Sequence, residues 1–205
     1  MKRLLLKYVK TGRLAYLSHL ETMRALERAL RRAGLPLAYS QGFSPHPRIS
    51  STPALPVGVG SLGEYLEVGL DREVEISGLA ERINRGMPRD LRVSAAEMLP
   101  EHFPKMSRWV HYALYRVEEK EGGEAARVFL ALPLAAAGSE GEPGGFPRLR
   151  DALEQLRERE GWKTDDRPYV IRQGLYASLD EIGEEAEGRV MEASGREARL
   201  REVKI

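Results

Sequence analysis

The sequence predicts an α+β protein with a ferredoxin-like first domain of the split β-α-β type, followed by a second, smaller or incomplete ferredoxin-like half. Two observations support this prediction. Segments with strand-like alternation and segments with helical periodicity follow one another in the order β-α-β-β-α-β over residues 1–99. The order β-β-α-β then follows over residues 109–180.

The first helix is the best-marked element of the chain. Ser18 and Glu21 form a capping box, in which each residue can hydrogen-bond the backbone N–H of the other. Gly34 and Pro36 end the helix, since glycine tolerates the left-handed conformation and proline cannot continue a helix. The apolar residues of this helix recur at spacings of three and four, which predicts one buried face: Leu20, Met23, Leu26, Leu30 and Ala33.

The other elements of the first domain follow from alternation and from glycine and proline signals. Strands are expected at residues 2–9, 35–39, 64–70 and 91–99, an extended stretch at 48–51, and a second helix at 79–85. Residues 58–63 match the G-x-G-x-x-G pattern, but Pro53 and Pro56 precede them and an alternating strand follows. A dinucleotide site needs a buried strand before this pattern and a helix after it, so these residues are interpreted as a glycine-rich turn.

Residues 100–108 are interpreted as a linker to the second domain, residues 109–180. Strands are expected there at 110–118, 126–133 and 169–177, and a helix at 147–160. Residues 181–205 are rich in charge and poor in large apolar side chains, which indicates a partly ordered tail. Leu200, Val203 and Ile205 could add an edge strand.

Composition excludes several classes of site. The 205 residues include no cysteine, which removes disulfides, thiolate metal ligands and a self-held iron–sulfur cluster. The chain has no apolar run long enough to span a membrane and no signal-peptide pattern, so a cytoplasmic protein without membrane contact is expected.

Basic residues are concentrated in the first quarter of the chain. Residues 1–50 carry ten Lys and Arg against two acids, whereas the other 155 residues carry 22 basic and 29 acidic side chains. Such a local excess is typical of a surface that binds an anionic partner. A solvated helix face with pairing between Glu27 and Arg31 is the alternative.

The candidate binding residues lie on the first helix and in the loop at residues 39–48. That loop combines aromatic, basic and small polar side chains, which suits a surface that stacks bases and hydrogen-bonds phosphates or sugars. The predicted nucleic-acid-binding residues are Arg24, Arg28, Arg31, Arg32, Tyr39, Ser40, Gln41, Phe43, Ser44, His46 and Arg48. Lys2, Lys7 and Lys10 could add charge at the first strand. The alternative is a rigid connection in which Tyr39 and Phe43 belong to the core.

Two histidines offer a catalytic alternative. If the fold brings His19 and His46 together, they could act as base and acid in metal-free RNA cleavage. No spacing of metal ligands recurs, since His102 and His111 lie outside this region, and a metal site is not expected. Glu64 and Glu67 could join His46 only if the fold places them nearby.

Long motifs between residues 17 and 65 resemble the radical-SAM-associated family. The matching segments are L-S-H-L at 17–20, the helix end R-A-L-E-R-A-L-R-R-A-G-L-P at 24–36, A-Y-S-Q-G-F-S-P-H-P-R-I-S at 38–50, L-P-V-G-V-G-S at 55–61 and G-E-Y at 63–65. Members of that family occur as a C-terminal extension of B12-type radical SAM proteins or as separate proteins, and this chain resembles the separate form. The tandem layout is also similar to that of RNA-binding RAMP proteins, a likeness of element order alone.

The resemblance implies an accessory role. We expect a non-catalytic RNA-binding or substrate-presenting module, which binds no cofactor and works with a separate radical SAM protein. The alternatives are a RAMP-like, metal-independent endoribonuclease that uses His19 and His46, and a protein–protein adaptor that binds no nucleic acid.

Overall fold

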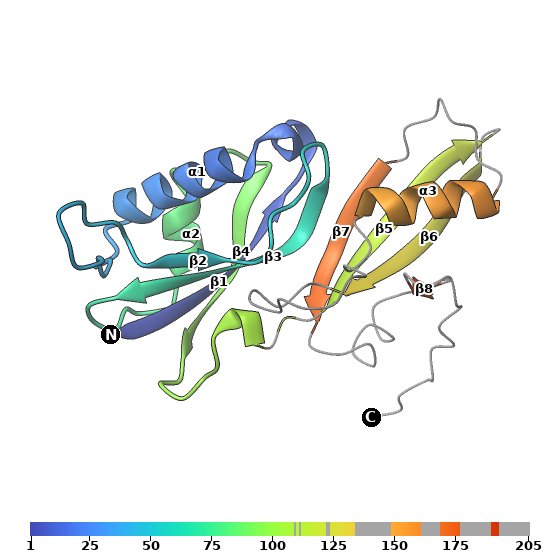
Figure 1. The fold of residues 1–205 in the computed structure, drawn as a ribbon. Helices are drawn as coiled ribbons and strands as arrows, with labels where there is room; N and C mark the ends of the chain where they lie inside the picture. The colour runs from blue at the N-terminus through green and yellow to red at the C-terminus, as the bar shows by residue number, and fades with distance from the viewer. Residues whose placement is uncertain are drawn as a thin grey trace. The chain divides into compact units, whose positions relative to one another are not determined.

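The computed structural model describes residues 1–108, 110, 112–121, 124–133, 149–160, 169–176 and 190–192. The chain divides into two compact units, Met1–Met106 and Ser107–Ile205. Each unit combines a β-sheet with helices, which confirms the predicted α+β class (Figure 1).

The first unit is built on a four-stranded antiparallel sheet. Its strands are β1 (Lys2–Lys10), β2 (Ile49–Ser51), β3 (Gly60–Leu70) and β4 (Leu91–Leu99). They lie in the order β4-β1-β3-β2, with Lys2 opposite Leu70 and Lys10 opposite Ser61 in the central pair. A split β-α-β arrangement produces this order, so the fold agrees with the ferredoxin-like prediction.

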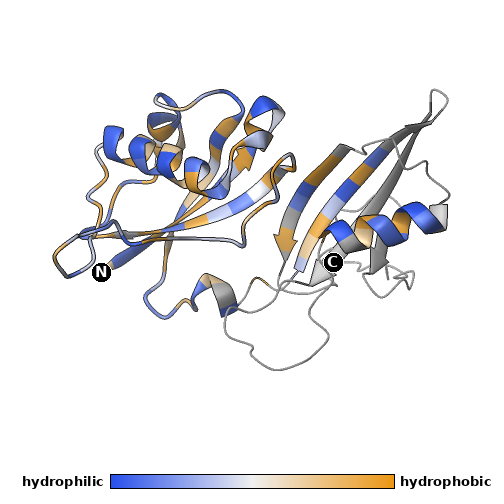
Figure 2. Cartoon of the chain, turned by 45° about the horizontal axis from the view of Figure 1, so that its top comes forward, coloured by the Kyte–Doolittle hydropathy of each residue, from blue (hydrophilic) through white to orange (hydrophobic). Residues whose placement is uncertain are grey.

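Two helices, α1 (His19–Arg32) and α2 (Leu79–Asn84), cover one face of this sheet (Figure 1). Hydrophobic positions alternate with hydrophilic ones along the strands and recur along α1, so that the two layers share one core (Figure 2). The buried core includes Leu4, Leu6, Leu26, Ala29, Leu30, Leu66, Val68, Leu70, Leu79, Ile83, Leu91 and Val93. Burial of each such leucine is worth about 2 kcal/mol.

The N-terminus of α1 has the predicted capping box. Ser18 donates from its backbone N–H and its hydroxyl to Oε2 of Glu21, at 2.9 and 2.6 Å, and the Glu21 N–H donates to the Ser18 hydroxyl at 3.3 Å. These hydrogen bonds from Ser18 lower the pKa of the Glu21 carboxyl. A short 3-10 helix, η1 (Gly12–Tyr16), connects β1 to this cap.

The second unit has the sheet order β7-β5-β6-β8. Its strands and helix are β5 (Tyr112–Glu121), β6 (Glu124–Pro133), α3 (Leu149–Glu160), β7 (Tyr169–Tyr176) and β8 (Val190–Glu192), and a short 3-10 helix, η2 (Met106–Arg108), lies where the two units join along the chain. The pairs of β5 with β6 and β7 are antiparallel, while β6 and β8 are parallel. The predicted β-β-α-β order is therefore present, with an additional short strand from the charged tail.

Several local predictions differ from the structure. Residues 35–39 form two isolated bridges, Leu37 with Leu70 and Tyr39 with Pro47, in place of a strand. Strand β3 begins at Gly60, inside the expected glycine-rich turn, because Ser61 pairs with Lys10. Leu20 is exposed, and Thr22 and Ala29 are buried in α1 instead. The possible edge strand at Leu200, Val203 and Ile205 lies outside the described residues.

We expect Ser18→Ala to destabilise the first turn of α1 by about 1 kcal/mol, because the backbone N–H of Glu21 loses its acceptor. Hydrogen–deuterium exchange of residues 19–32 should then become about fivefold faster. Ser50→Ala, at an exposed serine of β2, is the control and should leave exchange unchanged. Equal exchange in the two variants would show that the cap contributes nothing.

Candidate functional site

Four arginines form an exposed face on α1, the arginine face: Arg24, Arg28, Arg31 and Arg32. They lie opposite the buried residues because they occupy the other side of the helical repeat. Arg31 pairs with Glu27, with Nη2 and Oε1 at 2.6 Å, so the expected intrahelical pair is present. Within the described part of the chain, Arg24, Arg28 and Arg32 form no ion pair. This face therefore offers positive charge to solvent.

Two of the three lysines of β1, Lys2 and Lys10, do not extend this face freely. Lys2 pairs with Glu73 at 3.0 Å and with Glu101 at 3.4 Å. Lys10 is buried. Arg3 of the same strand is held in the protein by Glu67, with Nε and Oε1 at 2.7 Å. Much of the basic charge that the sequence places on this strand is thus neutralised or covered.

The loop at residues 39–48, here called the aromatic loop, is closed by hydrogen bonds between its two arms. The Ser40 N–H donates to the His46 carbonyl at 2.8 Å, and the His46 N–H donates to the Ser40 hydroxyl at 3.0 Å. Arg48 donates from its N–H to the carbonyl of Ala38 and from Nε to the carbonyl of Tyr39. These contacts define the shape of the loop mainly through the backbone.

The tip of the aromatic loop presents its side chains to solvent. Phe43 is completely exposed, at 112% of its reference area, and 42% of Tyr39 is exposed. The alternative in which these two rings belong to the core is therefore wrong. The remaining predicted residues of the loop are exposed or half-buried: Ser40, Gln41, Ser44, His46 and Arg48. A phenyl ring that lies uncovered on a loop is available to stack on a ligand, and this makes Phe43 a candidate contact residue.

Gly69 of β3 holds the base of the aromatic loop against the sheet. Its N–H donates to the Arg48 carbonyl at 2.7 Å, and its carbonyl accepts from Ala38 at 2.9 Å. A Cβ at this position would lie 3.0 Å from Cβ of Arg48 and 3.0 Å from Sδ of Met1. Glycine is needed here because the backbone of the loop approaches the strand closely.

The two candidate catalytic histidines lie at different places in the first unit. His19 opens α1, and its Nε2 lies 3.4 Å from the hydroxyl of Ser51. His46 belongs to the aromatic loop, which lies beyond the opposite end of α1 (Figure 1). The helix has 14 residues and is about 20 Å long. No hydrogen bond joins the two histidines in the described part of the chain.

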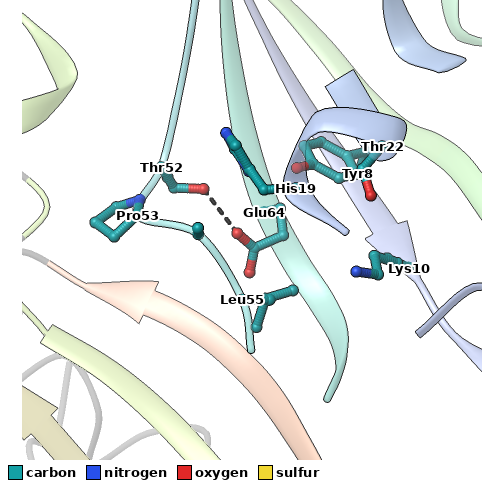
Figure 3. A pocket seen from close by; sticks show the side chains of 9 residues that line it. Tyr8, Lys10, His19, Thr22, Thr52, Pro53, Leu55 and Glu64 are labelled. Carbon is teal, nitrogen blue, oxygen red and sulfur yellow. Dashed lines mark hydrogen bonds between the residues drawn. The ribbon is translucent and has the colours of Figure 1, made fainter. Parts of the chain in front are cut away.

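His19 instead lines a small polar recess at the N-terminal end of α1, here called the polar recess (Figure 3). Its polar walls are Tyr8, Lys10, His19, Thr22, Thr52 and Glu64, and residues 53–55 complete it. Glu64 is buried and accepts from the Thr52 hydroxyl at 2.7 Å and from the Ser61 hydroxyl at 2.7 Å.

Lys10 extends from β1 toward Glu64 in this recess (Figure 3). Its Nζ donates to the Leu17 carbonyl at 2.7 Å. Burial lowers the pKa of the Lys10 ammonium, and the negative charges of Glu64 and Glu21 partly oppose this shift. The recess therefore combines a buried cation and a buried anion on neighbouring strands.

Strand alternation contains the signal that identifies these two residues. Lys10 continues the inward series of Leu4, Leu6 and Tyr8 on β1. Glu64 likewise precedes the inward residues Leu66, Val68 and Leu70 on β3. A charged residue at an inward position of a half-buried strand is unusual, which makes it a candidate functional residue. From the sequence alone, Lys10 is expected only to add surface charge, and Glu64 is considered only as a possible neighbour of His46.

Metal binding and membrane spanning find no support among the described residues. No group of three or more His, Cys, Asp or Glu side chains is arranged to hold a metal ion there. Glu67, one of the conditional ligands, is bound by Arg3 through two hydrogen bonds, at 2.7 and 2.9 Å. The described helices are also too short or too polar to cross a bilayer.

Comparison with known proteins gives one family. Residues 3–169 match the family described as "uncharacterized protein conserved in bacteria" (DUF2344), and this range includes the arginine face, the aromatic loop and the polar recess. Comparison of the sequence with curated proteins found no match.

The buried ammonium of Lys10 predicts a pH dependence of stability. Because its pKa is lowered below the ordinary value of 10.5 in the folded protein, the unfolded chain binds more protons between the two values. The free energy of unfolding contributed by Lys10 therefore rises as pH increases through the lowered pKa toward 10.5.

Urea unfolding from neutral to alkaline pH tests this prediction. Relative to Lys10→Met, the wild type should gain stability as pH rises, since the variant has no ammonium to lose. Lys7→Met, on the same strand, is the matched control and should keep the wild-type trend. A difference between wild type and Lys10→Met that does not change with pH would contradict burial of the charge.

Proposed function

The chain belongs to the DUF2344 family of proteins conserved in bacteria, and from the surface of its first unit we propose that it is an RNA-binding accessory module. In this proposal the module presents a phosphate-bearing substrate to a radical SAM enzyme, and RNA is the substrate that we propose. The observation that carries the proposal is the coexistence of unpaired arginines on α1 with an exposed aromatic ring on a closed loop.

The arginine face suits a phosphate backbone. Arg24, Arg28 and Arg32 keep their charge exposed to solvent, and guanidinium groups can form paired hydrogen bonds with phosphate oxygens. Successive exposed arginines along one helix side match a chain of regularly spaced charges. Binding through such contacts releases counterions and therefore weakens as salt increases.

The aromatic loop suits unpaired bases. Phe43 projects a ring that no part of the described protein covers, and Tyr39, four residues earlier in the loop, is partly exposed. Bases of single-stranded RNA stack on such rings irrespective of their identity. Gln41, Ser44 and Arg48 carry the hydrogen-bonding groups that could contact base edges, sugars or phosphates. The loop and α1 together support single-stranded RNA as the ligand.

The positions of the two histidines favour an accessory role over RNA cleavage. Concerted acid–base catalysis requires both groups within hydrogen-bond reach of one phosphodiester, and His19 and His46 lie toward opposite ends of α1. The radical SAM partner is inferred from the sequence resemblance. None of the 205 residues is a cysteine, so these residues do not supply thiolates for the iron–sulfur cluster of such chemistry.

The double variant Arg24→Ala/Arg28→Ala tests the arginine face. We expect weaker binding to single-stranded RNA, with the slope of log affinity against log salt reduced by about 1.4, because each single-strand phosphate contact contributes about 0.7. Fluorescence anisotropy at several salt concentrations measures both quantities.

The matched control is Arg82→Ala/Arg85→Ala, which removes two exposed arginines from the region of α2. This control should change affinity and slope much less than the α1 variant. Equal losses in the two variants would mean that only net charge matters. If the wild type binds no nucleic acid, the proposal fails, and an adaptor that binds an acidic protein surface becomes the better hypothesis.

Phe43→Ala tests the aromatic loop. Loss of one base-stacking contact should weaken RNA binding at least about fivefold, the lower end of the range for such contacts. Protein stability should not change, because the ring is exposed. Phe43→Tyr keeps an aromatic ring and should retain most of the affinity. Wild-type affinity in Phe43→Ala would exclude stacking on this residue.

A further inference from the structure

Buried polar side chains of the first unit gather at one place. In the described residues of that unit, the buried polar or charged residues are Lys10, Thr22, Thr52, Ser61 and Glu64. Four of them, Lys10, Thr22, Thr52 and Glu64, line the polar recess, and the fifth, Ser61, donates a hydrogen bond to Glu64. Burying this many polar groups costs free energy that an apolar core would avoid. Their concentration at one recess therefore indicates a ligand site.

The ammonium of Lys10 has hydrogen-bonding capacity left over. An ammonium carries three N–H donors, and one of them is used by the Leu17 carbonyl. The side chain points across the recess toward Glu64, which provides a charge but forms no ion pair with it within the described structure (Figure 3). A buried ammonium with unused donors gains free energy from any acceptor that enters the recess.

The charges around the recess restrict the chemistry of that ligand. A phosphate or carboxylate would face the negative charges of Glu64 and Glu21, and a cationic group would face Lys10. A purely apolar group would leave the ammonium donors unsatisfied. A hydroxyl group avoids these penalties, because it is neutral, accepts a hydrogen bond from Lys10 and can donate one to Glu64.

Residues of the polar recess and of the arginine face are neighbours in the sequence of α1. His19 and Thr22 of the recess belong to the first turn of α1, and Arg24 follows two residues later on the exposed side. A strand whose phosphates follow the arginines toward the N-terminus of α1 therefore reaches the recess by passing around this first turn.

We propose that the polar recess binds a ribose 2′-hydroxyl of the RNA strand, with Lys10 as donor to it and Glu64 as acceptor from it. This inference rests on the proposed RNA binding and adds the group that distinguishes RNA from DNA. The arginine face supplies affinity for either nucleic acid, because both have the same phosphates. The recess supplies the preference for RNA, because the 2′-hydroxyl is the group that DNA lacks.

The first experiment needs only the wild-type protein. Anisotropy compares a single-stranded oligonucleotide as RNA, as DNA with uracil bases, and as 2′-O-methyl RNA, at one salt concentration. We expect RNA to bind about tenfold more tightly than the other two probes. This factor is the lower end of what one hydrogen bond to a charged group contributes to affinity. Equal affinity for the three probes would overturn the recess proposal and leave the proposed function intact. Absence of binding to all three would overturn both.

Two variants then locate the preference. Lys10→Met keeps the length of the buried stem, and Glu64→Gln keeps the size of the carboxyl group, so each removes one charge. Both should lower RNA affinity to the level of DNA and leave DNA affinity unchanged. Arg24→Ala/Arg28→Ala should lower the affinity for RNA and the affinity for DNA by the same factor. Retention of the RNA preference in Lys10→Met and Glu64→Gln, or an equal loss for RNA and DNA, would contradict the assignment.

Discussion

The packing of α1 across β1 and β3 determines where the other features of the first unit lie. Leu26 and Leu30 of the helix are buried in one core with Leu4, Leu66 and their neighbours on the strands. This contact orients the helix, because its apolar stripe must face the sheet. The arginines consequently face solvent. One end of α1 lies over the ends of β1 and β3 that carry Lys10 and Glu64, and the aromatic loop lies beyond the other end.

The same constraint explains how the charge of the first quarter is divided. The sequence concentrates basic residues there, but the sheet gives them different environments. Lys2 and Arg3 meet acidic side chains, Lys10 is buried, and only the helix keeps a series of arginines open to solvent. A count of charges therefore overstates the size of the surface, while the position of each charge on its element identifies the part that can bind an anion.

Much of the fold could be predicted because local signals agreed with the tertiary contacts. The capping box of Ser18 and Glu21 determines the start of α1, and alternation locates β4 at its observed bounds. Prediction failed where long-range pairing decides the structure. Gly60 joins a strand because Ser61 faces Lys10, and Leu20 is exposed although its spacing suits the apolar face. For Phe43 the sequence leaves two environments open, an exposed binding ring and a core position, because phenylalanine as a residue type favours burial, and the structure shows the exposed one.

The candidate site shows the same division. The exposed positions of Arg24 and Arg28 follow from helical periodicity, whereas the proximity of Lys10 to Glu64 depends on the register of β1 with β3. A one-residue shift of that register would turn one of the two side chains to the other face of the sheet. The polar recess is therefore a product of strand pairing, and a search for local motifs does not detect it.

The closure of the aromatic loop determines which of its positions can be substituted without loss of its shape. The bonds of Ser40, His46 and Arg48 hold the two arms together, and Gly69 secures their base, so the residues at 41–45 take little part in maintaining the shape. The tip can therefore accept new side chains at little cost to folding, except at Gly42, whose φ of +136° favours glycine. The side chains at the tip of the loop can therefore vary while its base stays fixed. Substitutions at the tip could give relatives of this chain different ligands while the sheet and helices stay the same.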